Sequence, residues 1–194
     1  MAYCLHTDVK LYLGIKGSGD DTLIDDLITR AQATIDTFAR RSFEASADTT
    51  RNFDAVADTN GRTLIVDKDL ASITTVTNGD GNTISSSNYV TEPRNDTPYR
   101  SITILGSSTS YWQGATNGDN EDAISIAGKW AYSTSAPDDI KHACILLASW
   151  LYRRKDSIGS DADRPLITGD GVTILPSTMP AEVQQIIKRY RRLV

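Results

Sequence analysis

The sequence is poor in the residues that covalent cross-links and catalysis require. Its 194 residues include only two cysteines, Cys4 and Cys144, and two histidines, His6 and His142. Two cysteines make no disulfide framework, which excludes a disulfide-stapled secreted scaffold and suits a reducing compartment. The chain has no apolar run near the roughly 20 residues of a membrane span and begins without the features of a signal peptide. We therefore expect neither a membrane segment nor a leader.

The same scarcity leaves no recognisable constellation for chemistry. His142 and Cys144 are two positions apart, so on one helix they do not face each other as base and nucleophile. The glycines at 14–19 lack the Lys-Ser/Thr pair of a Walker motif and the preceding strand of a Rossmann fingerprint. The acidic run at 119–122 lacks EF-hand spacing. We expect no catalytic residue, no cofactor and no metal site, and we expect that the protein is not an enzyme.

Charge is unevenly distributed along the chain, which has a net charge of −5. Residues 44–139 carry 6 basic and 14 acidic side chains, whereas residues 140–194 carry 9 basic and 5 acidic ones. Two interpretations stay open. The split indicates two surfaces that meet different partners, or it reflects only basic helix ends and acidic loops.

Helical periodicity marks the first part of the chain. Residues 7–13 are typical of a short helix with Thr7 as N-cap. A longer helix is predicted over about 21–41, capped by Asp20 and Asp21 and closed by Arg40 and Arg41. Its apolar stripe recurs at spacings of three and four and consists of Leu23, Ile24, Leu27, Ile28, Ala31, Ile35 and Phe38.

A second long helix, over about 138–155, is the segment around which we expect the fold to be built. Pro137, Asp138 and Asp139 suit a helix start, and cations follow at the other end. Apolar residues cover most of its faces, which predicts burial on several sides. Its core positions are Ile140, Ala143, Cys144, Leu147 and Leu151. A C-terminal helix over about 179–193 follows, opened by Pro180.

Between the two long helices the apolar period changes to two, which is typical of strands. Candidate strands are 51–56, 62–66, 73–77, 89–91, 101–105 and 123–127. The turn at 78–81 predicts a hairpin between its flanking segments. The fold class is therefore α+β, a small helical bundle with a β-rich insertion. We divide the chain into a helical core (1–43 and 137–194), the insertion (44–136), and an extended loop or arm (156–176) within the core.

Cations crowd the helix ends, most densely at the C-terminus. Dipole complementarity and solubility explain most single clusters, but four cations within five residues exceed what one helix end needs. With the neighbouring apolar residues this terminus is a candidate for docking into a partner's groove. The candidate docking residues are Lys188, Arg189, Tyr190, Arg191, Arg192, Leu193 and Val194. The alternative is a DNA-binding or DNA-packaging accessory protein that uses the basic helix ends.

Four segments together resemble one family, the head–tail connector or head-completion adaptor proteins of tailed phages. They are residues 7–13 (TDVKLYL), 20–28 (DDTLIDDLI), 70–76 (LASITTV) with the turn at 78–81, and 137–141 (PDDIK) with the apolar residues that follow. Their order and spacing carry the resemblance, which covers residues 5–105 and 123–155.

The resemblance implies a non-enzymatic ring, often a dodecamer, beneath the portal protein. Such a ring extends the DNA channel and joins the head to a stopper or tail-completion protein, and the C-terminal segment commonly reaches into the portal. Genomic DNA would pass through the channel without sequence-specific binding. The resemblance implies no membrane partner. The expected location is the head–tail junction of the virion, after assembly in the host cytoplasm.

Overall fold

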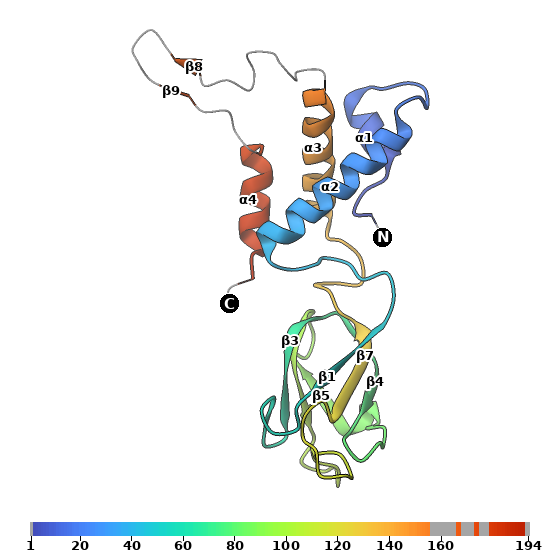
Figure 1. Cartoon of the computed structure of the whole chain (residues 1–194), viewed down its shortest axis with the longest axis vertical. Coiled ribbons are helices and arrows are strands. Elements are labelled where there is room, and N and C mark those ends of the chain that lie inside the picture. Colours follow the sequence, from blue (N-terminus) through green and yellow to red (C-terminus); the bar gives the residue numbers. More distant parts are fainter. Residues whose placement is uncertain (1, 156–165, 168–172, 175–178, 193–194) are drawn as a thin grey trace. The chain divides into compact units, whose positions relative to one another are not determined.

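The computed structural model describes residues 2–155, 166–167, 173–174 and 179–192. In this part of the chain it contains four α-helices and antiparallel sheets, which confirms the α+β class (Figure 1). The chain forms two compact units. One consists of Arg41–Ala136, and the other combines Ala2–Arg40 with Pro137–Val194.

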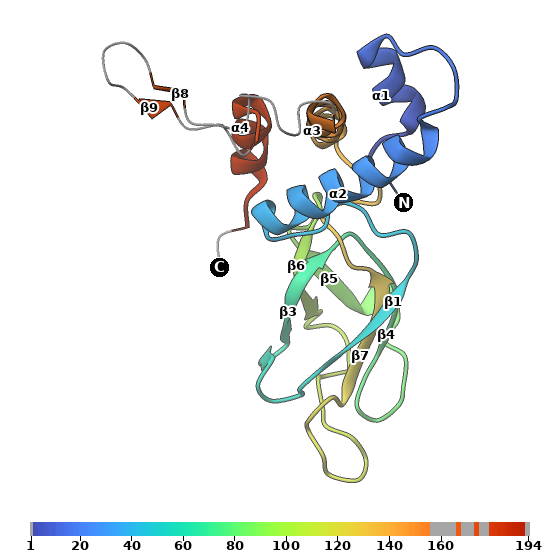
Figure 2. The same cartoon turned by 45° about the horizontal axis from the view of Figure 1, so that its top comes forward.

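The helical unit contains α1 (His6–Leu13), α2 (Asp21–Ala39), α3 (Asp138–Arg154) and α4 (Ala181–Tyr190). Helix α3 packs against all three of the others, and α2 also packs against α1 and α4 (Figure 2). Of the proposed core positions on α3, Leu151 is half-buried and the other four are at most 2% exposed. These four are Ile140, Ala143, Cys144 and Leu147. The apolar sides of α3 are therefore covered by α1 and α2 from the N-terminal part of the chain and by α4 from the C-terminal part.

Helix boundaries differ from the predicted ones by one to three residues. The helix predicted over 21–41 ends at Ala39, because Arg40 adopts a left-handed backbone conformation with φ of 56°. The helix predicted over 138–155 ends at Arg154, and the last helix spans Ala181–Tyr190 instead of 179–193. The prediction of Thr7 as N-cap was wrong. Leu5 occupies that position, and its N–H donates to the Asp8 carboxylate at 3.0 Å.

Asp20 lies at the N-cap position of α2, but its side chain makes no capping bond. Its carboxylate instead accepts a hydrogen bond from the hydroxyl of Tyr152 and lies 3.3 Å from the Nζ atom of Lys155. Both partners lie at the end of α3. These two bonds, from Tyr152 first and Lys155 second, lower the pKa of Asp20. The start of α2 is thereby tied to the end of α3.

The other unit contains two antiparallel sheets. One has the order β1-β7-β4, and the other has the order β2-β3-β6-β5. The strands are β1 (Thr49–Phe53), β2 (Thr59–Asn60), β3 (Thr63–Leu70), β4 (Ser72–Thr77), β5 (Tyr89–Glu92), β6 (Tyr99–Ile104) and β7 (Ile124–Lys129). Their inward side chains form one shared core, as alternation along half-buried strands predicts. Its largest members include Phe53, Leu64, Leu70, Ile102, Ile104, Trp112, Ile124 and Ile126.

The predicted hairpin around 78–81 was wrong in its extent. The turn is present and is closed by a bridge between Thr77 and Thr83. Beyond it, the 3₁₀ turn Ser86–Asn88 precedes β5. As a result β4 pairs with β7, whereas β5 pairs with β6 in the other sheet. A local turn signal specifies the turn itself but not which strands pair after it.

A buried ion pair lies at the first residue of this unit. The Nε atom of Arg41 lies 3.3 Å from the Oδ2 atom of Asp69, with side-chain exposures of 9% and 6%. The guanidinium carbon of Arg41 is also 5.1 Å from the ring centroid of Tyr132. Arg41 therefore does not end α2 at the surface, as the sequence had suggested, but is part of the β unit's interior.

The predicted arm at 156–176 lies outside the described residues except for two short strands. These are β8 (Leu166–Ile167) and β9 (Thr173–Ile174), which pair antiparallel.

Removing one partner of the buried pair is expected to destabilise the protein strongly. Asp69→Ala leaves the Arg41 charge buried without its carboxylate, which should lower the free energy of unfolding by about 3–5 kcal/mol. The matched control is Asp67→Ala, which breaks the more exposed Arg51–Asp67 pair and should cost less than about 1 kcal/mol. Urea unfolding followed by tryptophan fluorescence measures both, and equal losses would contradict the prediction.

Asp20 should make stability depend on acid pH. Its folded-state pKa lies below that of the unfolded chain, so its stabilising effect is complete above about pH 4. The effect is lost as the pH falls through the lower folded-state value. Wild type should therefore lose its advantage over Asp20→Asn below about pH 4, as measured by Tm against pH. Parallel curves for the two proteins would show that the carboxylate contributes nothing.

Candidate functional site

The candidate docking residues lie at the end of α4 and divide into two groups. Val183, Ile186 and Ile187 bury the apolar face of this helix. That orientation leaves Lys188 and Arg189 exposed. The docking prediction also covers Leu193 and Val194, which lie outside the described residues.

One group faces the start of α3. The Nη1 atom of Arg189 is 4.0 Å from the Oδ2 atom of Asp139, and the Tyr190 hydroxyl donates to the same oxygen at 3.5 Å. These contacts are solvent-exposed and long, so they contribute little to stability. Arg189 can therefore exchange Asp139 for groups on a partner at small cost.

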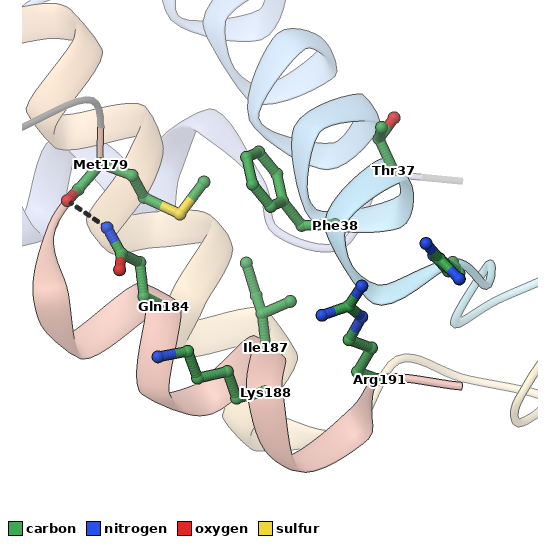
Figure 3. Close-up of a pocket in the computed structure, with 8 residues that line it drawn as sticks. Thr37, Phe38, Met179, Gln184, Ile187, Lys188 and Arg191 are labelled. Carbon is green, nitrogen blue, oxygen red and sulfur yellow. Dashed lines mark hydrogen bonds between the residues drawn. The ribbon is translucent and has the colours of Figure 1, made fainter. Parts of the chain in front are cut away.

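The other group lines a pocket between the ends of α2 and α4, with a volume of about 600 Å³. We call it the α2–α4 groove (Figure 3). Its lining consists of Thr37, Phe38, Arg40, Met179, Gln184, Ile187, Lys188 and Arg191. The two helix ends are held together by the Arg192 N–H, which donates to the carbonyl of Ala39 at 2.9 Å.

The groove combines an apolar interior with a basic rim. Met179 and Ile187 are 3% and 4% exposed, whereas Phe38 is 58% exposed and faces Ile187 across the groove (Figure 3). The cations are Arg40, Lys188 and Arg191, and the described residues that line the groove include no carboxylate. Both helices end here, and their negative dipole ends favour cations. The site is suited to an apolar side chain accompanied by negative charge.

The sequence missed the α2 half of this site. Phe38 lies between Leu27 and Ala31 around the helix axis, so the apolar stripe predicted that it would be buried. The structure overturns this for Phe38 and for Leu23, which is 38% exposed. Phe38 is in the last turn of α2, where the stripe continues past its packing partners. The sequence signal for its exposure was the position of Phe38, an apolar residue only two positions before the arginine that ends the helix.

The remaining basic helix ends are engaged within their own unit. The guanidinium carbon of Arg154 lies 4.6 Å from the ring centroid of Trp150, and the Nζ atom of Lys155 lies 4.0 Å from that of Tyr152. Arg41 is buried as well. The basic helix ends, which the DNA-binding alternative treats as one set, therefore have different surroundings in the structure.

The two cysteines meet inside the helical unit, where Sγ of Cys4 and Sγ of Cys144 are 3.4 Å apart. The hydrogen bond between them, and then burial, raises the pKa of Cys144, which keeps it an inert thiol. Within the described residues no group of three or more His, Cys, Asp or Glu side chains is placed to hold a metal ion. None of the described helices is long and apolar enough to cross a bilayer.

A family model for head completion proteins matches residues 5–193 of the chain. The chain belongs to the head completion protein family. This membership confirms the resemblance carried by the four sequence segments, and it supports a head–tail connector role for a structural protein of a phage-type virion.

Two solved structures have folds similar to that of this head completion protein. One is described as the neck of an empty GTA particle computed with C6 symmetry, with a TM-score of 0.58 and 15% identity. The other is the virion of a native gene transfer agent (GTA) particle, with a TM-score of 0.57 and 18% identity. In both cases the match covers 97% of this chain and 89% of the other. None of the curated proteins compared by sequence matches the chain.

Two substitutions separate the buried wall of the groove from its exposed wall. Ile187→Ala should lower the free energy of unfolding by about 2–4 kcal/mol, because it empties a packed position. Phe38→Ala should cost less than about 1 kcal/mol, because surface substitutions rarely cost more. Thermal and urea unfolding measure both. A large loss from Phe38→Ala would mean that this ring already serves the fold and is not available to a partner.

Proposed function

We propose that this head completion protein is a non-enzymatic connector that forms a ring beneath the portal protein. The ring extends the DNA channel and joins the head to a stopper or tail-completion protein. The observation that carries the proposal is the family match across residues 5–193. The fold shared with neck proteins of a particle computed with sixfold symmetry supports it and suits a ring of six or twelve copies.

In this proposal the helical residues, 1–43 and 137–194, form the body of the ring and residues 44–136 form an insertion on it. A ring requires heterologous contacts, in which one face of a copy meets a different face of its neighbour. The unequal charges of the two parts of the chain support such a contact. Assembly would take place in the host cytoplasm, and the finished ring would lie at the head–tail junction of the virion.

The portal would be contacted by the C-terminal end of α4 and the residues after it. Arg189 supports this, because its long and exposed contact with Asp139 can be exchanged for groups on a partner at small cost. DNA would pass through the channel without sequence-specific contacts. The burial of Arg41, and the contacts of Arg154 and Lys155 with neighbouring residues, count against a DNA-binding function that uses all the basic helix ends.

Native mass spectrometry of the full chain, alone and mixed with the portal protein of the same particle, tests the proposal. We expect a stoichiometric ring of this chain on the portal. A variant that lacks residues 190–194 should remain folded by circular dichroism and bind the portal at least about tenfold more weakly, since about 1.4 kcal/mol of lost contact suffices. A wild-type chain that ignores the portal would refute the connector role, and a truncated chain that docks equally well would refute only C-terminal docking.

A further inference from the structure

The α2–α4 groove is a surface whose chemistry specifies what can fill it. The exposed ring of Phe38 favours an apolar group, and the buried side chains of Met179 and Ile187 line the interior beside it. Arg40, Lys188 and Arg191 around them require negative charge. A nucleic-acid backbone supplies charge but no apolar group for the interior. A polypeptide segment with one apolar side chain flanked by carboxylates satisfies both requirements.

The β unit of the same chain carries such a segment. The side chain of Val56 is 66% exposed in the turn after β1. Asp54 and Asp58 flank it in the sequence, and Glu121 and Asp122 are exposed on the neighbouring loop. We call these five residues the acidic tip.

Backbone contacts hold the two parts of the acidic tip together. Phe53 pairs with Ile124 at the end of the β1–β7 ladder. The N–H of Ala55 then donates to the carbonyl of Asn120 at 2.9 Å. The turn that displays Val56 and the loop that carries Glu121 and Asp122 are therefore adjacent.

The turn itself is preorganised. The Asp54 carboxylate accepts hydrogen bonds from the N–H groups of Val56 at 2.6 Å and Ala57 at 2.8 Å. The N–H of Asp54 donates to the Asp58 carboxylate at 2.8 Å. Bonds of this kind fix the turn before any partner arrives, so docking Val56 costs little conformational entropy.

We propose that the α2–α4 groove of one copy receives the acidic tip of a second copy, with Val56 against Phe38 and Ile187. Glu121 and Asp122 then face Lys188 and Arg191. The contact joins two different surfaces, as the proposed ring requires, and repeating it from copy to copy gives a ring when the rotation between neighbours closes. The inference rests on the proposed ring and names the contact that builds it.

The charge balance of the two units fits this pairing. Arg41–Ala136 holds seven Arg or Lys residues and twelve Asp or Glu residues. The groove offers three cations and, among its described lining residues, no carboxylate. Complementary charge of this kind accelerates encounter and disfavours contacts between like surfaces.

Charge exchange between the two surfaces tests the contact. One variant carries Lys188→Glu with Arg191→Glu, and the other carries Glu121→Lys with Asp122→Lys. Each alone should form the ring on the portal at least about tenfold less well, because like charges then meet. An equimolar mixture should restore the ring, because each altered groove meets an altered tip and each native groove meets a native tip.

The control has the same change of charge away from the groove, Lys16→Glu with Arg30→Glu, both at exposed positions. It should assemble as wild type does. Circular dichroism confirms that every variant is folded. If the groove variant loses the ring only because it docks on the portal more weakly, mixing it with the tip variant will not restore the ring. Failure of the mixture would therefore overturn the inference.

A second measurement does not depend on altered charges. Val56→p-benzoylphenylalanine places a photo-crosslinker on the acidic tip of the full chain in the ring on the portal. Crosslinked peptides should contain residues 37–40 or 184–191 of another copy. Crosslinks only to the portal, to DNA or to other positions would overturn the inference and leave the connector role standing. Absence of any ring with the wild-type chain would instead refute the proposed function.

Discussion

Burial of α3 is the constraint on which the rest of the helical unit depends. This helix is apolar on most of its faces, so it must be covered on several sides to leave water. The cover comes from α1 and α2 at one end of the chain and from α4 at the other. The other compact unit, Arg41–Ala136, is formed by the chain between α2 and α3. Covering α3 therefore requires the two ends of the chain to meet.

The meeting of chain ends also creates the groove. Helices α2 and α4 both reach their C-termini at this place, tied by the bond from Arg192 to Ala39. Cations gather because the dipole ends of both helices favour them. Phe38 is left exposed because the apolar stripe of α2 extends past its packing partners. A basic rim around an apolar interior is thus a by-product of covering α3 and is available for a partner.

The charged residues of the chain divide into those paired within the protein and those exposed at its surface, a division that the net charge does not show. Some cations form ion pairs within the protein, Arg41 with the buried Asp69 and Lys155 with the partly exposed Asp20. Others, at the groove, remain at the surface. The acidic residues of the β unit likewise divide into those that cap turns, such as Asp54, and those exposed on loops, such as Glu121. In the proposed contact between copies, the exposed Glu121 and Asp122 carry the charge pairing, whereas Asp54 holds the turn that displays Val56.

The sequence by itself determined the helices, most strands and the buried role of Ile140, Ala143, Cys144 and Leu147, because these follow from local periodicity and from apolar residues on several faces of one helix. The family also followed from the order of short local segments. Tertiary structure decided which strands pair, where Arg41 and Asp20 find their partners, and that Phe38 is exposed. Each of these depends on residues far away in the sequence. A periodic pattern shows which side of an element is apolar, but whether that side is covered is decided by where the neighbouring elements end.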